Sequence, residues 1–289
     1  MNLFLSIPAA IRYMLLSTLG FALMGACVKA AGMRGIPVLE IVAARAAVSL
    51  LLSYLDIKRK RIQVWGEQKM LLVARGAIGA VALVCVYYSV TTLTLADATV
   101  LQYTHPAFTA LLALLFLGER IRAATLVCLL LSFAGVLVMV RPGAVAEGFS
   151  ALPALSLAAA LAGAFGSAAA YVLVRKLSQT EDSSVIIFYF PLIALPASLV
   201  MLGDTLVIPD MEGLMLLLLV GIFTQMGQIG LTKAMATESA AKATAYSYVQ
   251  VIFAALLGIW LFAEIPTLWT LLGGGLIIAG ALINALWKR

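Results

Sequence analysis

Charged residues are scarce in this sequence. They make up 11% of the 289 residues, whereas soluble domains carry about 25%. Apolar residues make up 64%, and the mean hydropathy is +1.10. So few charges could not cover the apolar surface of a water-soluble fold of this size. We therefore expect lipid, rather than water, to surround most of the chain.

Residues that bind metals or form disulfides are also few. The three cysteines, Cys27, Cys85 and Cys128, lie far apart inside apolar runs, which predicts packing residues rather than a disulfide framework or a metal site. The sequence has one histidine and neither a GxxxxGK[ST] phosphate loop nor an HExxH motif. We expect no catalytic residues, no metal and no cofactor, and an ATP-driven pump on this chain alone is disfavoured.

The apolar runs predict an all-α integral membrane protein with ten transmembrane helices. A helix needs about 20 apolar residues to cross a bilayer, and turn-forming or charged residues separate the runs. The expected spans are Ile11–Ala31, Ile36–Leu55, Met70–Leu93, Ala98–Leu117, Ala123–Val140, Leu155–Val174, Val185–Leu202, Leu214–Leu231, Ala240–Phe262 and Thr267–Trp287.

The basic residues predict the orientation of these spans. If the spans alternate, 14 of the 19 Lys and Arg residues fall on the side that also holds both termini, and three fall on the other side. Cytoplasmic loops carry an excess of Lys and Arg. We therefore expect a multi-pass protein of the cell inner (plasma) membrane, with cytoplasmic N- and C-termini.

The second half of the sequence repeats the first. Residues 92–140 align without gaps with residues 237–285, at an offset of 145, and Tyr103 pairs with Tyr248 and Phe108 with Phe253. This predicts two five-helix repeats, residues 1–145 and 146–289. Because five is odd, the second repeat enters the membrane from the opposite side, and inverted repeats are typical of secondary transporters.

Short motifs within the repeats carry a family resemblance. They are the run from Leu101 to Pro106, the Leu117–Arg120 segment and Ala134–Gly135–Val136, which is echoed around Ala279–Gly280. With ten spans and an arginine inside the second, the chain resembles the EamA-type branch of the drug/metabolite transporter superfamily. The resemblance implies a carrier, with export of amino acids, aromatic ones among them, or of related metabolites. It also implies a central cavity lined mainly by helices 1, 3, 4, 6, 8 and 9.

Arg45 is the first candidate for the transport site. It lies about nine residues, or roughly 14 Å, inside its expected span. A cation at that depth costs about 2.5–3.5 kcal/mol unless it faces water, a carboxylate or helix carbonyls. Arg45 either attracts a substrate carboxylate or clamps a neighbouring helix.

Tyr103 and Tyr248 lie at similar depths in spans entered from opposite faces. One hypothesis makes them the outer and inner gates of alternating access. The alternative places them in the aromatic belt at the membrane interface.

Other polar residues inside the spans should avoid lipid and face protein or a wet cavity. For each, an interhelical hydrogen bond is an alternative to substrate contact, and His105, which can titrate near neutral pH, raises the question of proton coupling. The substrate-binding candidates besides Arg45 are Gln102, Tyr103, His105, Gln225, Gln228, Tyr246, Tyr248 and Gln250.

Pro106 is expected to kink the fourth span, because it removes one helix hydrogen bond. Glu119 and Glu264 are expected at helix N-termini, where a carboxylate complements the helix dipole.

The sequence therefore predicts a monomeric secondary carrier that exports small organic solutes, amino acids or related metabolites, as one repeat rocks against the other. Its expected partners are the solute, the lipid bilayer and, if transport is coupled, protons; nucleic acid is not expected. The alternative is a membrane-embedded enzyme or a flippase for a lipid-linked substrate.

Overall fold

The computed structural model describes residues 8–92, 101–118, 123–139, 154–263 and 268–287, and every regular element among them is helical. Helices are expected here, because lipid offers no partner to a backbone N–H or C=O and the helix satisfies these groups internally. The helices are α1 (Ala9–Met33), α2 (Val38–Lys60), α3 (Lys69–Thr92), α5 (His105–Leu117), α6 (Ala123–Met139), α8 (Ala154–Leu177), α9 (Ser183–Leu202), α10 (Met211–Thr237), α11 (Ala240–Ala245), α12 (Val249–Phe262) and α13 (Leu268–Leu286), with short 3-10 turns η2 (Gly203–Thr205) and η3 (Tyr246–Tyr248).

Each of the ten expected spans overlaps a helix of the described residues, but the lengths of these helices differ. Seven helical segments in the described chain are long and apolar enough to cross a membrane. Three further apolar segments are shorter: His105–Leu117, Ala123–Gly135 and Leu271–Gly280. The prediction of a multi-helix membrane protein is confirmed, whereas a count of ten complete spans stays a prediction.

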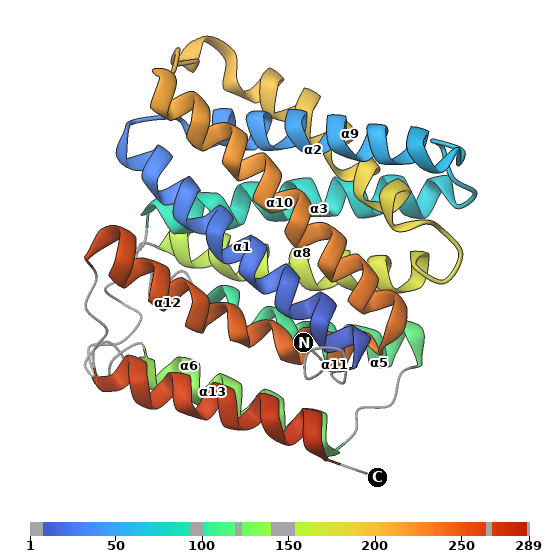
Figure 1. Ribbon diagram of the computed structural model, residues 1–289, viewed down its shortest axis with the longest axis vertical. Helices are drawn as coiled ribbons and strands as arrows, with labels where there is room; N and C mark the ends of the chain where they lie inside the picture. Colours follow the sequence, from blue (N-terminus) through green and yellow to red (C-terminus); the bar gives the residue numbers. More distant parts are fainter. Residues whose placement is uncertain (1–7, 93–100, 119–122, 140–153, 264–267, 288–289) are drawn as a thin grey trace.

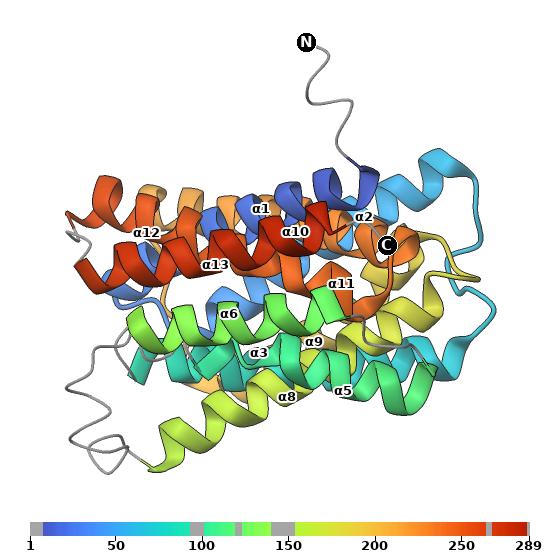
Figure 2. The ribbon, with the colours of Figure 1, turned by 90° about the horizontal axis from the view of Figure 1, so that it is seen from below.

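The two halves of the sequence are interleaved in space. The most extensive helix contacts pair α1 with α10, α6 with α13, α3 with α8 and α2 with α9, and each of these pairs joins one half to the other. Figures 1 and 2 show α1, α10, α12 and α13 in one layer and α3, α5, α6 and α8 in the other. Neither half packs as a separate bundle, so the expected rocking of one repeat as a body against the other does not fit this packing.

The helices recur along the chain at the spacing seen in the sequence. Helices α2 and α9 begin 145 residues apart, and helices α5 and α12 end 145 residues apart. The contacts recur too, because α1 packs on α10 and α12 as α8 packs on α3 and α5. A given helix therefore has the same kind of neighbours in both halves.

Glycines allow the closest of these contacts. A Cβ on Gly230 in α10 would lie 2.5 Å from the Tyr13 carbonyl oxygen in α1. A Cβ on Gly163 in α8 would lie 3.0 Å from the backbone nitrogen of Val86 in α3. Small residues let membrane helices approach closely and gain van der Waals contact, and here they hold the helices that flank the centre.

The helix is interrupted at the same place in both halves. A turn at Tyr103–Thr104 precedes α5, and η3 separates α11 from α12. The prediction that Pro106 kinks the interior of a continuous helix is therefore wrong. Pro106 lies in the first turn of α5, where a backbone N–H would have no partner within the helix, so its absence costs no hydrogen bond. Glu119 and Glu264 lie outside the described residues.

Candidate functional site

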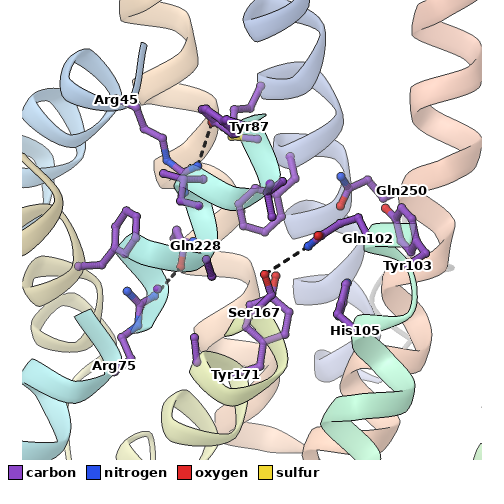
Figure 3. A pocket seen from close by; sticks show the side chains of 18 residues that line it. Arg45, Arg75, Tyr87, Gln102, Tyr103, His105, Ser167, Tyr171, Gln228 and Gln250 are labelled. Atoms are coloured by element: carbon purple, nitrogen blue, oxygen red, sulfur yellow. Dashed lines mark hydrogen bonds between the residues drawn. The ribbon is translucent and has the colours of Figure 1, made fainter. Parts of the chain in front are cut away.

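A cavity of about 160 Å³ lies between the two layers, beside the interrupted helices. Figure 3 shows Arg45 and Arg75 on one side of it and Gln102, His105 and Gln250 on the other. Its wall draws on both halves of the chain: Phe21, Met24, Arg45, Arg75, Gly79, Ala82, Leu83, Val86, Tyr87, Gln102, Tyr103, His105, Ser167, Ala170, Tyr171, Phe190, Gln228 and Gln250. Helices 2 and 7 of the expected ten thus join the six that the family resemblance implies.

Arg45 reaches the cavity from α2 and is 4% exposed. Its Nη1 donates a hydrogen bond to the Tyr87 hydroxyl at 3.0 Å, and its guanidinium lies 5.3 Å from the centre of the Phe190 ring. Its Nε is buried without a hydrogen-bond partner among the described residues. Both hypotheses for Arg45 therefore keep support, because it holds a neighbouring helix and also faces the cavity.

Arg75, in α3, is a second buried arginine that the sequence reading did not single out. It is 3% exposed, and its Nη2 donates to Gln228 Oε1 at 3.0 Å. Its Nε and Nη1 have no hydrogen-bond partner in the described part of the chain. A cation inside the membrane is costly without a partner, and this holds for Arg75 as it does for Arg45.

The two arginines form a concentrated positive site. Their guanidinium carbons lie 5.3 and 5.2 Å from the centre of the same Phe190 ring, so they are at most about 10.5 Å apart. At an effective dielectric constant of about 20, this separation implies a repulsion of at least about 1.6 kcal/mol. The described lining contains no Asp or Glu to offset it, and the buried Glu40 instead accepts a hydrogen bond from the Val207 backbone at 3.0 Å.

The opposite wall is polar and neutral. Gln102 Nε2 donates to the Ser167 hydroxyl at 3.2 Å, while its Oε1 has no partner among the described residues. The His105 ring contacts Tyr103 and Tyr171, with centroids 5.8 and 5.3 Å away, and its Nδ1 is likewise buried without a described partner. This wall offers a buried acceptor and a ring nitrogen to a bound molecule.

Tyr103 and Tyr248 touch each other instead of lying at separate depths. Their ring centroids are 5.5 Å apart, and the Tyr248 hydroxyl donates to the Tyr103 carbonyl at 3.0 Å. The hypothesis of two separate gates is therefore wrong, and so is the interfacial belt for these two buried residues. Depth counted along a continuous helix fails here, because both spans are interrupted at these residues.

The other predicted site residues divide between the cavity and the helix contacts. Gln228 and Gln250 line the cavity. Gln225 instead bridges α10 to α2, accepting from Ser49 at 2.6 Å and donating to Ser53 at 2.9 Å. Tyr246 and Tyr248 are buried in apolar clusters outside the cavity wall.

A second cavity, of about 150 Å³, adjoins the first. The two share Tyr87, Gln102 and Gln250, and the second extends between α1 and α12 to Lys29 and Phe262. Lys29 Nζ lies 4.7 Å from the centre of the Phe262 ring. The second cavity therefore lies beside the first, toward the C-terminal ends of α1 and α12.

Two segments of the sequence, residues 8–141 and 154–286, match the EamA-like transporter family. The chain belongs to this family. The segments cover most of the two predicted repeats, and the resemblance drawn from the sequence motifs is confirmed. The family and its named relatives are transporters rather than enzymes.

Relatives of this family member occur in bacteria and mammals. The chain is 33% identical over 276 residues to the pseudopaline exporter CntI of Pseudomonas aeruginosa, covering 95% of both chains. It is 29% identical to solute carrier family 35 member G1 of Mus musculus, covering 96% of this chain and 78% of that one. A crystal structure with 20% identity matches the fold with a TM-score of 0.81, covering 97% of this chain and 98% of the other.

Proposed function

We propose that this transporter is a secondary carrier that exports a small organic solute, an amino acid or a related metabolite, through the central cavity. The observation that carries the proposal is the cavity itself. It is lined by helices of both halves and carries buried polar groups. The pseudopaline exporter CntI, a relative along nearly the whole chain, is also an exporter of a small solute.

The packing supports alternating access in which the moving units are not the two sequence repeats. One unit consists of α1, α10 and α12, and the other of α3, α5 and α8; each contains helices from both halves. The repeated helix bounds of α2 with α9 and of α5 with α12, together with the repeated contacts, support an inverted internal symmetry, and such symmetry allows the same fold to open toward either face. We propose that these units, rather than residues 1–145 and 146–289, move relative to each other.

Counterflow in proteoliposomes tests the proposal. Liposomes that contain the purified protein are loaded with one unlabelled solute from a panel of amino acids and metabolites, and uptake of the same labelled solute is followed. A carrier accumulates the label transiently and returns it chemically unchanged. No counterflow with any member of the panel, or chemical conversion of the label, would contradict the proposal.

A variant that blocks the cavity, compared with a control on the same helix, tests whether the solute passes through the cavity. Ser167, on α8, lines the cavity and is half-buried, so Ser167→Phe should fill the space without removing a charge. Phe165, two residues earlier, is exposed on the same helix, and Phe165→Leu should leave counterflow unchanged. Equal rates in both variants would show that the solute takes another route.

A further inference from the structure

The charge of the cavity points to the chemistry of its ligand. We propose that the cavity binds an organic diacid, with its two carboxylates at Arg45 and Arg75 and a hydrogen-bond-donating group at Gln102. This inference rests on the proposed function for the location of the binding site, and it names the class of solute. The evidence is the juxtaposition of two buried arginines with a neutral polar wall in one cavity (Figure 3).

The arginines retain donors for a ligand. A guanidinium has five N–H groups in a planar fork that matches a carboxylate. Arg45 and Arg75 each place one hydrogen bond on a neutral side chain, Tyr87 and Gln228. Nε of both residues and Nη1 of Arg75 are buried without a described protein partner, and buried polar groups are normally satisfied. A purely structural clamp does not account for these donors.

The number of charges favours a diacid over a zwitterion with one carboxylate. Two positive charges lie within about 10.5 Å, and no acid is present in the described lining. A single carboxylate would compensate one guanidinium and leave the other uncompensated in a low-dielectric site, whereas two carboxylates on one short molecule compensate both. Each guanidinium then faces one carboxylate of the ligand.

The wall opposite the arginines and the volume of the cavities indicate the other polar group and the size of the ligand. Gln102 Oε1 can only accept a hydrogen bond, so it favours an amine, amide N–H or hydroxyl on the solute. A cavity of about 150 Å³ holds a molecule the size of benzene, so the two adjoining cavities together admit roughly a dozen non-hydrogen atoms. An amino-acid-derived diacid meets both requirements.

Ligand-induced thermal stabilisation tests this inference on the purified full-length protein in detergent. The probes are L-glutamate and L-2-aminoadipate, compared with L-glutamine, the monoamide of glutamate, and with L-leucine. The diacids should raise the unfolding temperature, and glutamine and leucine should raise it much less at the same concentration. Equal stabilisation by glutamate and glutamine, or no stabilisation by either diacid at millimolar concentration, would overturn the inference.

Arginine variants locate the effect. Arg45→Gln and Arg75→Gln should each weaken diacid binding by about tenfold or more, because each removes one buried charge partner. Arg45→Lys and Arg75→Lys keep the charge and should bind more tightly than the Gln variants, although they lose the planar fork. Arg59→Gln removes the same charge from a side chain that is 80% exposed at the end of α2 and should bind as the wild type does.

The outcomes separate this inference from the proposed function. Counterflow of leucine or glutamine without binding of a diacid would leave a carrier with a different solute class. Unchanged diacid affinity in both Gln variants would show that the arginines are structural. Diacid-specific stabilisation that is lost in Arg45→Gln and Arg75→Gln and retained in Arg59→Gln supports the inference.

Discussion

Replacing Gly230 by alanine should separate α1 from α10 and so disturb one wall of the cavity. The new Cβ would lie 2.5 Å from the Tyr13 carbonyl oxygen and 2.7 Å from the Ser17 backbone nitrogen, whereas ordinary contacts begin at 3.4 Å. Both neighbours are backbone atoms, which no side-chain rotation can move. The helices must therefore separate by about 0.9 Å at this point, and overpacking of this kind costs about 1–3 kcal/mol.

The consequence for transport follows from what α1 carries. Phe21 and Met24 of α1 line the cavity opposite residues of α3 and α8, so a displaced α1 changes the shape of the site. Gly230→Ala should lower both the unfolding temperature in detergent and the rate of counterflow. Gly32→Ala in α1 is the control, because a Cβ there meets nothing within 4 Å, and it should match the wild type.

An intermediate variant separates stability from the shape of the site. A Cβ on Gly227 would lie 2.6 Å from Cδ1 of Phe21, a side-chain atom in the cavity wall. Because the ring can shift, Gly227→Ala should lose less stability than Gly230→Ala and still slow counterflow. If Gly230→Ala unfolds at the same temperature as Gly32→Ala, the close packing of α1 on α10 is not as described and the reasoning fails.

Three further variants test other parts of the structure. Tyr248→Phe leaves the buried Tyr103 carbonyl without its hydrogen bond and should lower the free energy of unfolding by about 1–3 kcal/mol; an unchanged unfolding transition would contradict the contact between the two interrupted helices. Gln225→Leu removes an interhelical bond network worth about 0.6–1.7 kcal/mol and should leave solute selectivity unchanged, so altered selectivity would return Gln225 to the binding site. Burial raises the pKa of Asp182, but its hydrogen bonds, with that from Lys60 the strongest, and the charge of Lys60 together hold that pKa below its ordinary value. Asp182 therefore stabilises the fold at pH values above its unfolded-state pKa of about 3.9, and this stabilisation is lost as the pH falls through its lower folded-state pKa. The unfolding temperatures of the wild type and of Asp182→Asn should converge at acidic pH. A difference that stays constant with pH would argue against the interaction.

The sequence predicts the helices well because the surrounding lipid requires a helical backbone. Lipid requires long apolar runs in which the backbone bonds to itself, and each run was visible between its polar separators. The same reasoning identified Arg45, because a charge inside such a run demands a partner. Arg75, six residues from the start of α3, carries the same signal.

The arrangement of the helices could not be predicted from the runs. The parity of five spans indicates how each half enters the membrane, but it does not say which helices become neighbours, and the contacts prove to join the halves. Gln225 and Gln228 show the same limit on a smaller scale. They lie less than one turn apart on α10, yet one bonds to α2 and the other to Arg75 in α3, and only the packing distinguishes them.

The hydrogen bond between Arg75 and Gln228 connects the charge of the cavity with the proposed motion. Arg75 belongs to the unit of α3, α5 and α8, and Gln228 to the unit of α1, α10 and α12, so this bond crosses the boundary between them. A carboxylate at Arg75 carries a full negative charge, so it attracts the guanidinium more strongly than the neutral Gln228 amide does. Binding of a diacid would therefore weaken one contact that holds the units together at the moment the solute fills the space between them. On this reasoning, solute charge and conformational change act on the same guanidinium, so a carrier without Arg75 should lose solute selectivity together with the dependence of its motion on solute.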